Sequence, residues 1–125
     1  LQIAKKINCV TFIDVILPSN NDWEHLEKAT PFIDILHLNE IESKEFTKHN
    51  KPVKAAKEIV AKGVKLCVLS HGNKGLLAAN GKKVLEMPAF RGDQIDPTGA
   101  GDALCAGILK TFFELGCKVE FSLQN

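Results

Sequence analysis

The feature that most constrains the fold of this chain is a regular alternation between short apolar runs and helical segments. Runs of aliphatic and β-branched residues predict buried strands, and apolar positions repeating every 3.6 residues predict helices. The pattern predicts strands at residues 9–17, 33–38 and 64–70, a hairpin of 76–80 with 83–87, and helices at 23–29, 39–48, 52–62 and 99–115.

Strands that alternate with helices form parallel sheets covered by helices on both faces. The Asn80-Gly81 turn predicts one antiparallel hairpin within this arrangement. We therefore expect an α/β fold: a Rossmann-like, three-layer parallel sheet with helices on both faces and an inserted β-hairpin. At 125 residues, the chain has the length of one domain or of part of a larger one.

Polar residues lie near or after the C-terminal ends of the predicted strands at four places. These are Asp14, Asn39 with Glu42, Ser70 to Gly75, and Asp96 to Asp102. Ligands of open α/β sheets bind beyond the carboxyl ends of the strands. We expect the four groups to converge on one edge of the sheet. His25, His37 and His49 have no partner at catalytic spacing, so they are interpreted as structural or surface residues.

Charge and cysteine content exclude several classes of function. A net charge of +1 and a single arginine, Arg91, argue against nucleic-acid binding. No apolar run approaches the roughly 20 residues of a membrane span, and residues 1–6 do not resemble a signal peptide.

The four cysteines, Cys9, Cys67, Cys105 and Cys117, form no C-x-x-C pair. We expect buried, reduced thiols in a cytoplasmic protein rather than a zinc site.

The stretch Asp96-Pro97-Thr98-Gly99-Ala100-Gly101-Asp102 precedes the last predicted helix. Backbone N–H groups at a helix start have no intrahelical partner and carry partial positive charge, so they attract anions. Two glycines would let a phosphate approach these groups, and Asp102 would lie beside it. The spacing matches neither a Walker A loop nor a dinucleotide fingerprint. A plain N-terminal cap by Asp96 or Thr98 is the alternative, but it does not need two glycines.

Residues 96–107, Asp-Pro-Thr-Gly-Ala-Gly-Asp-Ala-Leu-Cys-Ala-Gly, resemble the C-terminal signature of the ribokinase-like (PfkB) carbohydrate kinases. The resemblance implies that Gly99, Ala100 and Gly101 form an anion hole for the transferred phosphoryl group. It also implies that Asp102 is the base that takes the proton from the sugar hydroxyl. Some relatives bind K⁺ through the equivalents of Asp96 and the Thr98 carbonyl, so potassium dependence stays open.

Two further segments match the family. Asn39 and Glu42 fit its Asn-x-x-Glu motif, which implies that they organise Mg²⁺ and phosphate; alone, they would be read as an ordinary helix start. The segment Ser70 to Gly75 falls where similar kinases contact the nucleotide, which implies roles for Ser70, Gly72 and Gly75. An ordinary glycine turn is the alternative. Lys74 is expected to be solvated, and His71 carries little functional signal.

The resemblance covers residues 1–125 as the C-terminal portion of a ribokinase-like domain, without the N-terminal half, the lid and the last helices. It implies an enzyme that transfers phosphate from Mg-ATP to a hydroxyl of a sugar or sugar-like alcohol. The alternatives are a nucleoside or vitamin-like alcohol as acceptor, or a noncatalytic relative that binds nucleotide or sugar phosphate. We expect the isolated chain to be inactive for want of an acceptor pocket. The sequence leaves a homodimer open.

Overall fold

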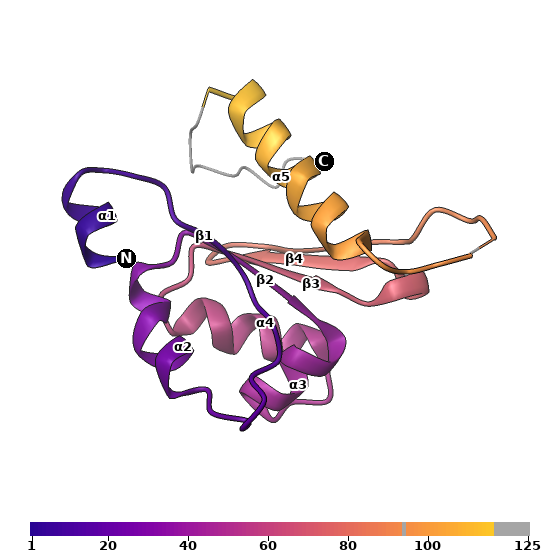
Figure 1. Ribbon diagram of the computed structural model, residues 1–125, viewed down its shortest axis with the longest axis horizontal. Coiled ribbons are helices and arrows are strands. Elements are labelled where there is room, and N and C mark those ends of the chain that lie inside the picture. Colours follow the sequence, from indigo (N-terminus) through magenta and orange to yellow (C-terminus); the bar gives the residue numbers. More distant parts are fainter. Residues whose placement is uncertain (94, 117–125) are drawn as a thin grey trace.

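The computed structural model describes residues 1–93 and 95–116. In this part of the chain, five strands form one sheet in the order β1-β2-β3-β4-β5 (Figure 1). The strands are β1 (Phe12–Asp14), β2 (Ile35–Asn39), β3 (Leu66–Ser70), β4 (Leu76–Asn80) and β5 (Val84–Met87). The first three are parallel, whereas β4 and β5 form an antiparallel hairpin on β3. The predicted α/β sheet with an inserted hairpin is confirmed.

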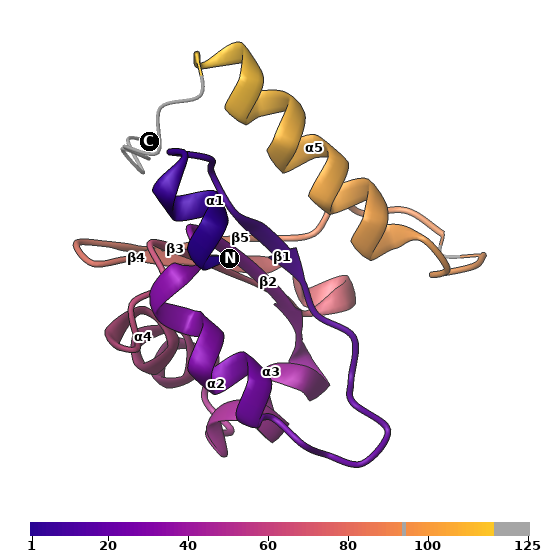
Figure 2. The same cartoon turned by 60° about the vertical axis from the view of Figure 1, so that its left-hand side comes forward.

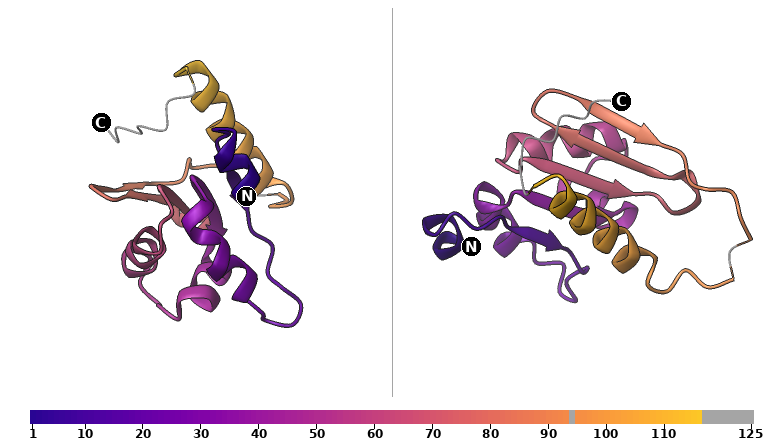
Figure 3. Two further views of the ribbon diagram at one scale, coloured as in Figure 1. Left: turned by 90° about the vertical axis from the view of Figure 1, so that its left-hand side faces the viewer. Right: turned by 90° about the horizontal axis from the view of Figure 1, so that it is seen from above.

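Helices cover both faces of this sheet. They are α1 (Gln2–Lys6), α2 (Glu24–Ala29), α3 (Glu40–Thr47), α4 (Pro52–Ala61) and α5 (Ala100–Glu114), with 3-10 turns η1 (Thr30–Phe32) and η2 (Gly72–Lys74). Figures 2 and 3 show α2, α3 and α4 on one face and α5 on the other. Among the described helices, none has the length and apolar character needed to cross a membrane.

The two faces have separate hydrophobic cores because side chains alternate along each strand. On β2, Leu36 and Leu38 join the core beneath α3 and α4, which includes Phe46 and Ile59. Ile35 points the other way, into a smaller core that Leu104 and Ile108 of α5 cover. Strand β2 is thus buried on both sides, as expected of a parallel sheet between helical layers.

Two predictions near the N-terminus are wrong. The strand predicted at residues 9–17 pairs with β2 only over Phe12–Asp14. It lies at the edge of the described sheet and has a neighbour on one side, so its flanking residues have no second ladder to hold them. Cys9 is therefore exposed rather than buried, whereas Cys67 and Cys105 are buried as predicted. Cys117 lies outside the described residues.

A buried carboxylate ties the N-terminal segment to the sheet. Asp34, just before β2, is 1% exposed, and it accepts hydrogen bonds from the Thr11 amide at 2.8 Å and the Thr11 hydroxyl at 3.0 Å. Lys5 pairs with the same carboxylate, and Lys65 approaches it at 2.8 Å. Burial raises the pKa of Asp34, but the hydrogen bonds from Lys5, Lys65 and Thr11 outweigh it and hold the pKa well below its ordinary value.

Replacing this carboxylate by an amide should weaken the fold. We expect Asp34→Asn to lower the free energy of unfolding by about 1–3 kcal/mol at neutral pH, because it removes charge-assisted hydrogen bonds. A depressed folded-state pKa contributes stability above the unfolded pKa of about 3.9, and this contribution is lost as the pH falls below it. The difference between wild type and variant should therefore shrink in acid.

Urea unfolding of the complete protein at neutral pH and in acid checks this expectation. Asp93→Asn, which changes an exposed loop carboxylate, is the matched control and should have little effect. A constant difference between wild type and Asp34→Asn at both pH values would contradict the assigned pKa shift.

Candidate functional site

The parallel strands end at a common edge, and each ends in a polar residue. These residues are Asp14 of β1, Asn39 of β2 and Ser70 of β3. Asp14 lies opposite His37, and Asn39 lies opposite Ser70. Helix α5 starts beside them, since a Cβ added at Gly101 would lie 3.8 Å from Cε1 of His37. The structure thus brings these strand ends and the start of α5 together, as predicted.

The N-terminus of α5 is not capped by a side chain. Its N-cap residue is Gly99, whose φ of 81° lies in the left-handed region that favours glycine. Asp96 and Thr98 do not cap it: Asp96 instead accepts a 2.8 Å hydrogen bond from the Thr98 amide within the preceding turn. The alternative of a plain cap by Asp96 or Thr98 is therefore wrong in the described part of the chain.

The amides at this helix start differ in how far they are engaged. The Ala100 amide donates to the Pro97 carbonyl at 3.1 Å, and the Ala103 amide makes the first bond back to Gly99 at 2.9 Å. Gly101 and Asp102 lie between them, in the first turn, where N–H groups have no intrahelical acceptor. The anion-binding role predicted for Gly99, Ala100 and Gly101 stays a prediction, and the Ala100 amide is the one of these whose N–H already has a backbone acceptor.

Carboxylates flank this helix start on both sides. Asp102 is exposed in the first turn of α5, where the helix dipole favours a negative charge. Asp96 precedes the helix, and hydrogen bonding from Thr98 lowers the pKa of its carboxyl group. Both carboxylates are exposed, so solvent and small ligands can reach their oxygen atoms.

Asn39 and Glu42 form a capping box at the start of α3. The Asn39 side chain accepts from the Glu42 amide at 2.9 Å, and the Glu42 carboxylate accepts from the Asn39 amide at 2.7 Å. Glu42 is 5% exposed. The interpretation of this pair as an ordinary helix start is thus confirmed, since one carboxylate oxygen of Glu42 accepts a hydrogen bond from the Asn39 backbone amide. The predicted role of this pair toward Mg²⁺ and phosphate stays a prediction.

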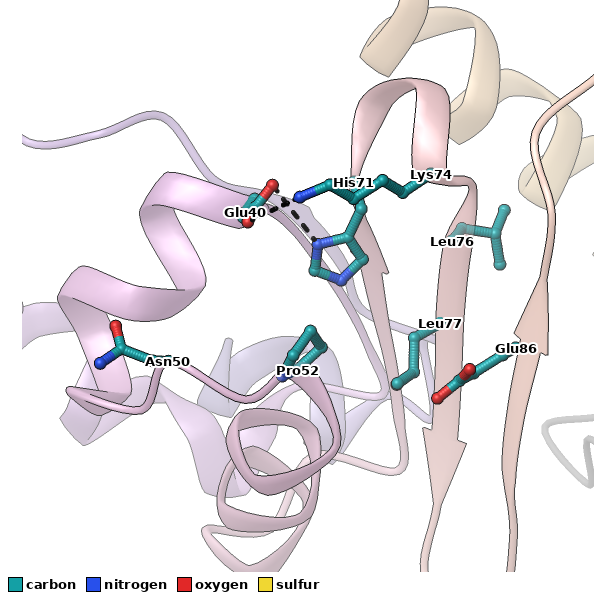
Figure 4. Close-up of a pocket in the computed structure, with 8 residues that line it drawn as sticks. All are labelled: Glu40, Asn50, Pro52, His71, Lys74, Leu76, Leu77 and Glu86. Carbon is teal, nitrogen blue, oxygen red and sulfur yellow. Dashed lines mark ion pairs between the residues drawn. The ribbon is translucent and has the colours of Figure 1, made fainter.

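The segment Ser70 to Gly75 leads from β3 through η2 into β4. Together with the starts of α3 and α4 it borders a pocket of about 360 Å³ (Figure 4). The pocket is lined by Glu40, Asn50, Pro52, His71, Lys74, Leu76, Leu77 and Glu86. Gly72 and Gly75 both have positive φ, 55° and 100°. The predicted nucleotide contacts of Ser70, Gly72 and Gly75 stay predictions, and the glycines also serve the turn itself.

Two charged or titratable residues of this turn differ in their surroundings. The Lys74 side chain is 71% exposed, as predicted, and lies 3.6 Å from Glu40. The His71 side chain is 9% exposed, its Nδ1 lies 3.9 Å from Glu40, and its Nε2 has no hydrogen-bond partner in the described structure. Burial lowers the pKa of His71, which favours the neutral ring. Figure 4 shows the ring directed into the pocket.

The sequence interpretation missed a buried polar cluster centred on His37. Its Nδ1 lies 2.6 Å from the Asp14 carboxylate, and its Nε2 lies 3.0 Å from the Ser70 hydroxyl. The Cys105 thiol of α5 lies 3.6 Å from Nδ1. His37 therefore does have partners, contrary to expectation. The available signal was the alternation of side chains along each strand. Asp14, His37 and Ser70 lie two residues after Phe12, Ile35 and Val68, which face α5, so they point to the same side of the sheet.

Cys105 is the helix's contribution to this cluster. It is 7% exposed, and burial, together with the charges of Asp14 and Asp102, raises the pKa of its thiol to about 11. The thiol is thus protonated near neutral pH rather than a reactive thiolate.

The comparisons with known proteins agree with this architecture. The model of the pfkB family carbohydrate kinases matches residues 1–124. The chain belongs to the pfkB family. A curated relative, the ATP-dependent 6-phosphofructokinase of Thermoanaerobacterium thermosaccharolyticum, is 27% identical over 77% of this chain and 33% of its own length.

Solved structures of kinases share the fold. A ribokinase from Thermotoga maritima is 28% identical, with a TM-score of 0.73 over 91% of this chain and 39% of its own. The aminoimidazole riboside kinase from Salmonella enterica, solved with aminoimidazole riboside and an ATP analog, is 24% identical, with a TM-score of 0.77 over 86% of this chain and 38% of its own. This pfkB-family chain thus spans between a third and two fifths of the length of these relatives.

Proposed function

We propose that the protein carrying this chain transfers a phosphoryl group from ATP to a hydroxyl of a sugar or sugar-like alcohol. One observation carries the proposal: α5 begins at an uncapped, left-handed Gly99, with an exposed carboxylate, Asp102, in its first turn. The arrangement supports an anion-binding helix start beside a group that can accept a proton. Phosphoryl transfer requires both, positioned together.

Each residue of the helix start has a role in this proposal. The amides of the first turn, with the Gly99–Gly101 segment, would bind the transferring phosphoryl group and stabilise its negative charge. Asp102 would accept the proton of the attacking hydroxyl as the new oxygen–phosphorus bond forms and ADP leaves. Mg-ATP supplies the activated phosphoryl group. Gly101 lacks a side chain that would obstruct the approach of either reactant.

The residues present also fit the metal ions that the proposal requires. Mg²⁺ prefers oxygen ligands and keeps several waters. Glu42 would act through the carboxylate oxygen that the capping box does not use, directly or through water, beside the Asn39 side chain. A K⁺ ion would be held by the Asp96 carboxylate and the Thr98 carbonyl. The hydrogen bond from the Thr98 amide to the Asp96 carboxylate already holds this turn.

The names of the relatives bear on the acceptor. They describe kinases of a sugar phosphate, of ribose and of an aminoimidazole riboside. All three acceptors carry a sugar hydroxyl, which supports a sugar or nucleoside acceptor for this protein. The turn Ser70 to Gly75 would contact the nucleotide, with Ser70, Gly72 and Gly75 as the contacting residues.

The test is ATP turnover by the complete protein against a panel of sugars, sugar phosphates and nucleosides. We expect at least one acceptor to stimulate ADP release and to yield a phosphorylated product. We expect the isolated 125 residues to show no such turnover, because they lack an acceptor pocket. Ligand binding without turnover in the complete protein would favour a noncatalytic relative and would contradict the proposal.

A further inference from the structure

The polar cluster centred on His37 has the donor set of a transition-metal site. We propose that Asp14, His37 and Cys105 bind a divalent ion of the Zn²⁺ class. The three side chains come from β1, β2 and α5, and their donor atoms all lie within 4.8 Å of one another. The proposal concerns metal binding alone and does not depend on the proposed kinase activity.

The spacing of the donors supports tetrahedral coordination. With Zn–S and Zn–N bonds of about 2.3 and 2.05 Å, a tetrahedral ion would hold sulfur and nitrogen about 3.5 Å apart. Sγ of Cys105 and Nδ1 of His37 are 3.6 Å apart without further adjustment. The Asp14 oxygen, now 2.6 Å from Nδ1, would have to move outward by about 0.7 Å to reach the corresponding nitrogen–oxygen separation.

Asp14 is the member of the cluster best able to make this movement. Its side chain is 38% exposed, whereas that of His37 is 4% exposed. It is also the last residue of β1, the edge strand of the described sheet. The two buried donors are thus already at coordination distance from each other, and the donor that must shift is the one at the open side.

Ser70 supplies the outer hydrogen bond that metal-binding histidines require. Its hydroxyl lies 3.0 Å from Nε2 of His37, so an N–H at Nε2 can donate to it while Nδ1 binds the ion. Starting from a neutral ring with its proton on Nδ1, metal binding moves that proton to Nε2. The Cys105 S–H proton leaves to solvent as the metal–sulfur bond forms, so one proton is released for each ion bound.

The donor set also selects the metal. A thiolate with an imidazole and one carboxylate suits Zn²⁺ or Co²⁺, whereas Mg²⁺ prefers oxygen ligands throughout. The arrangement Asp14–His37–Ser70 has the connectivity of a hydrolase triad. Such a triad does not need a thiol, however, whereas here the Cys105 thiol lies beside the same ring nitrogen that the Asp14 carboxylate contacts. Three protein ligands would leave a fourth coordination position open beside the first turn of α5.

Cobalt provides a spectroscopic test on the complete protein, freed of metal and kept reduced. We expect Co²⁺ to produce tetrahedral d–d bands together with a sulfur-to-cobalt charge-transfer band, and Zn²⁺ to displace it. Cys105→Ser should abolish the charge-transfer band. Cys9→Ser should retain it, since Cys9 is exposed and lies outside the cluster. Zn²⁺ should raise the melting temperature of the wild type but not of Cys105→Ser, because the ion links three elements.

Asp14→Asn is the second variant and keeps the proposal testable should Cys105→Ser fail to fold. It changes a half-exposed side chain at the end of a strand, and we expect it to weaken Co²⁺ binding about tenfold or more. The absence of the charge-transfer band in the wild type would overturn the proposal. An unchanged band in Cys105→Ser, or an unchanged affinity in Asp14→Asn, would do the same.

Discussion

Replacing Asp102 by asparagine should reduce the turnover number of the complete protein by about 10³-fold or more, while nucleotide affinity changes little. The amide keeps the size of the side chain and its place in the first turn of α5, but it cannot accept the proton of the attacking hydroxyl. General-base catalysis contributes about 10²- to 10⁴-fold to such reactions. The first-turn amides remain in place to bind phosphate, which is why affinity for the nucleotide should be retained.

Steady-state kinetics with saturating acceptor, together with nucleotide titration, separate these two effects. Glu114→Gln is the matched control: it neutralises an exposed carboxylate on the same helix, near its other end, and should leave turnover unchanged. If Asp102→Asn kept wild-type turnover, Asp102 would not be the base. Loss of nucleotide binding together with turnover would instead indicate damage to the helix start.

Most of the fold could be predicted from the sequence because its signals are local. The period of apolar residues and the positions of proline and glycine place β2, β3, the hairpin and helices α2 to α5 within a few residues. The edge strand β1 was predicted too long, since apolar content alone does not report how many neighbours a strand has. Only Phe12–Asp14 find partners on β2.

The candidate site was predictable where its chemistry lies in one continuous stretch. Residues 96–102 carry their own signal, and their two glycines already argued against a side-chain cap. The left-handed conformation of Gly99 as the N-cap residue is what the structure adds. The cluster of Asp14, His37 and Cys105 was missed because its members are separated by 23 and 68 residues. Cysteine and histidine spacing reports metal sites only when the ligands are neighbours in sequence.

Alternative interpretations from sequence need not exclude one another. Asn39 and Glu42 were explained either as a helix start or as ligands of a cation site, and the structure shows the capping box that the first explanation implies. The box fixes both side chains at the end of β2, where a ligand of the sheet would lie. A structural role that holds a carboxylate in place is compatible with the proposed binding role.

Gly75→Ala should destabilise the protein by about 3 kcal/mol or more, through strain at a positive φ and a steric clash. Gly75 has a φ of 100°, and an added Cβ would lie 1.9 Å from the Met87 carbonyl oxygen and 2.8 Å from the Ala89 amide nitrogen. These atoms belong to the backbone of the last residue of β5 and of the segment after it, so no side-chain rotation can relieve the contact. The turn and the segment after β5 would have to separate.

Gly81→Ala is the control, because no atom lies within 4 Å of a Cβ added there and its φ is not in the left-handed region. We expect urea unfolding of the complete protein to show a large loss of stability for Gly75→Ala and a small change for Gly81→Ala. A Gly75→Ala protein of wild-type stability would mean that this packing is absent in solution. If that stable protein had also lost nucleotide affinity, the role of Gly75 would be to contact the nucleotide rather than to form the turn. A glycine with a purely structural role would not affect binding when the fold is undisturbed.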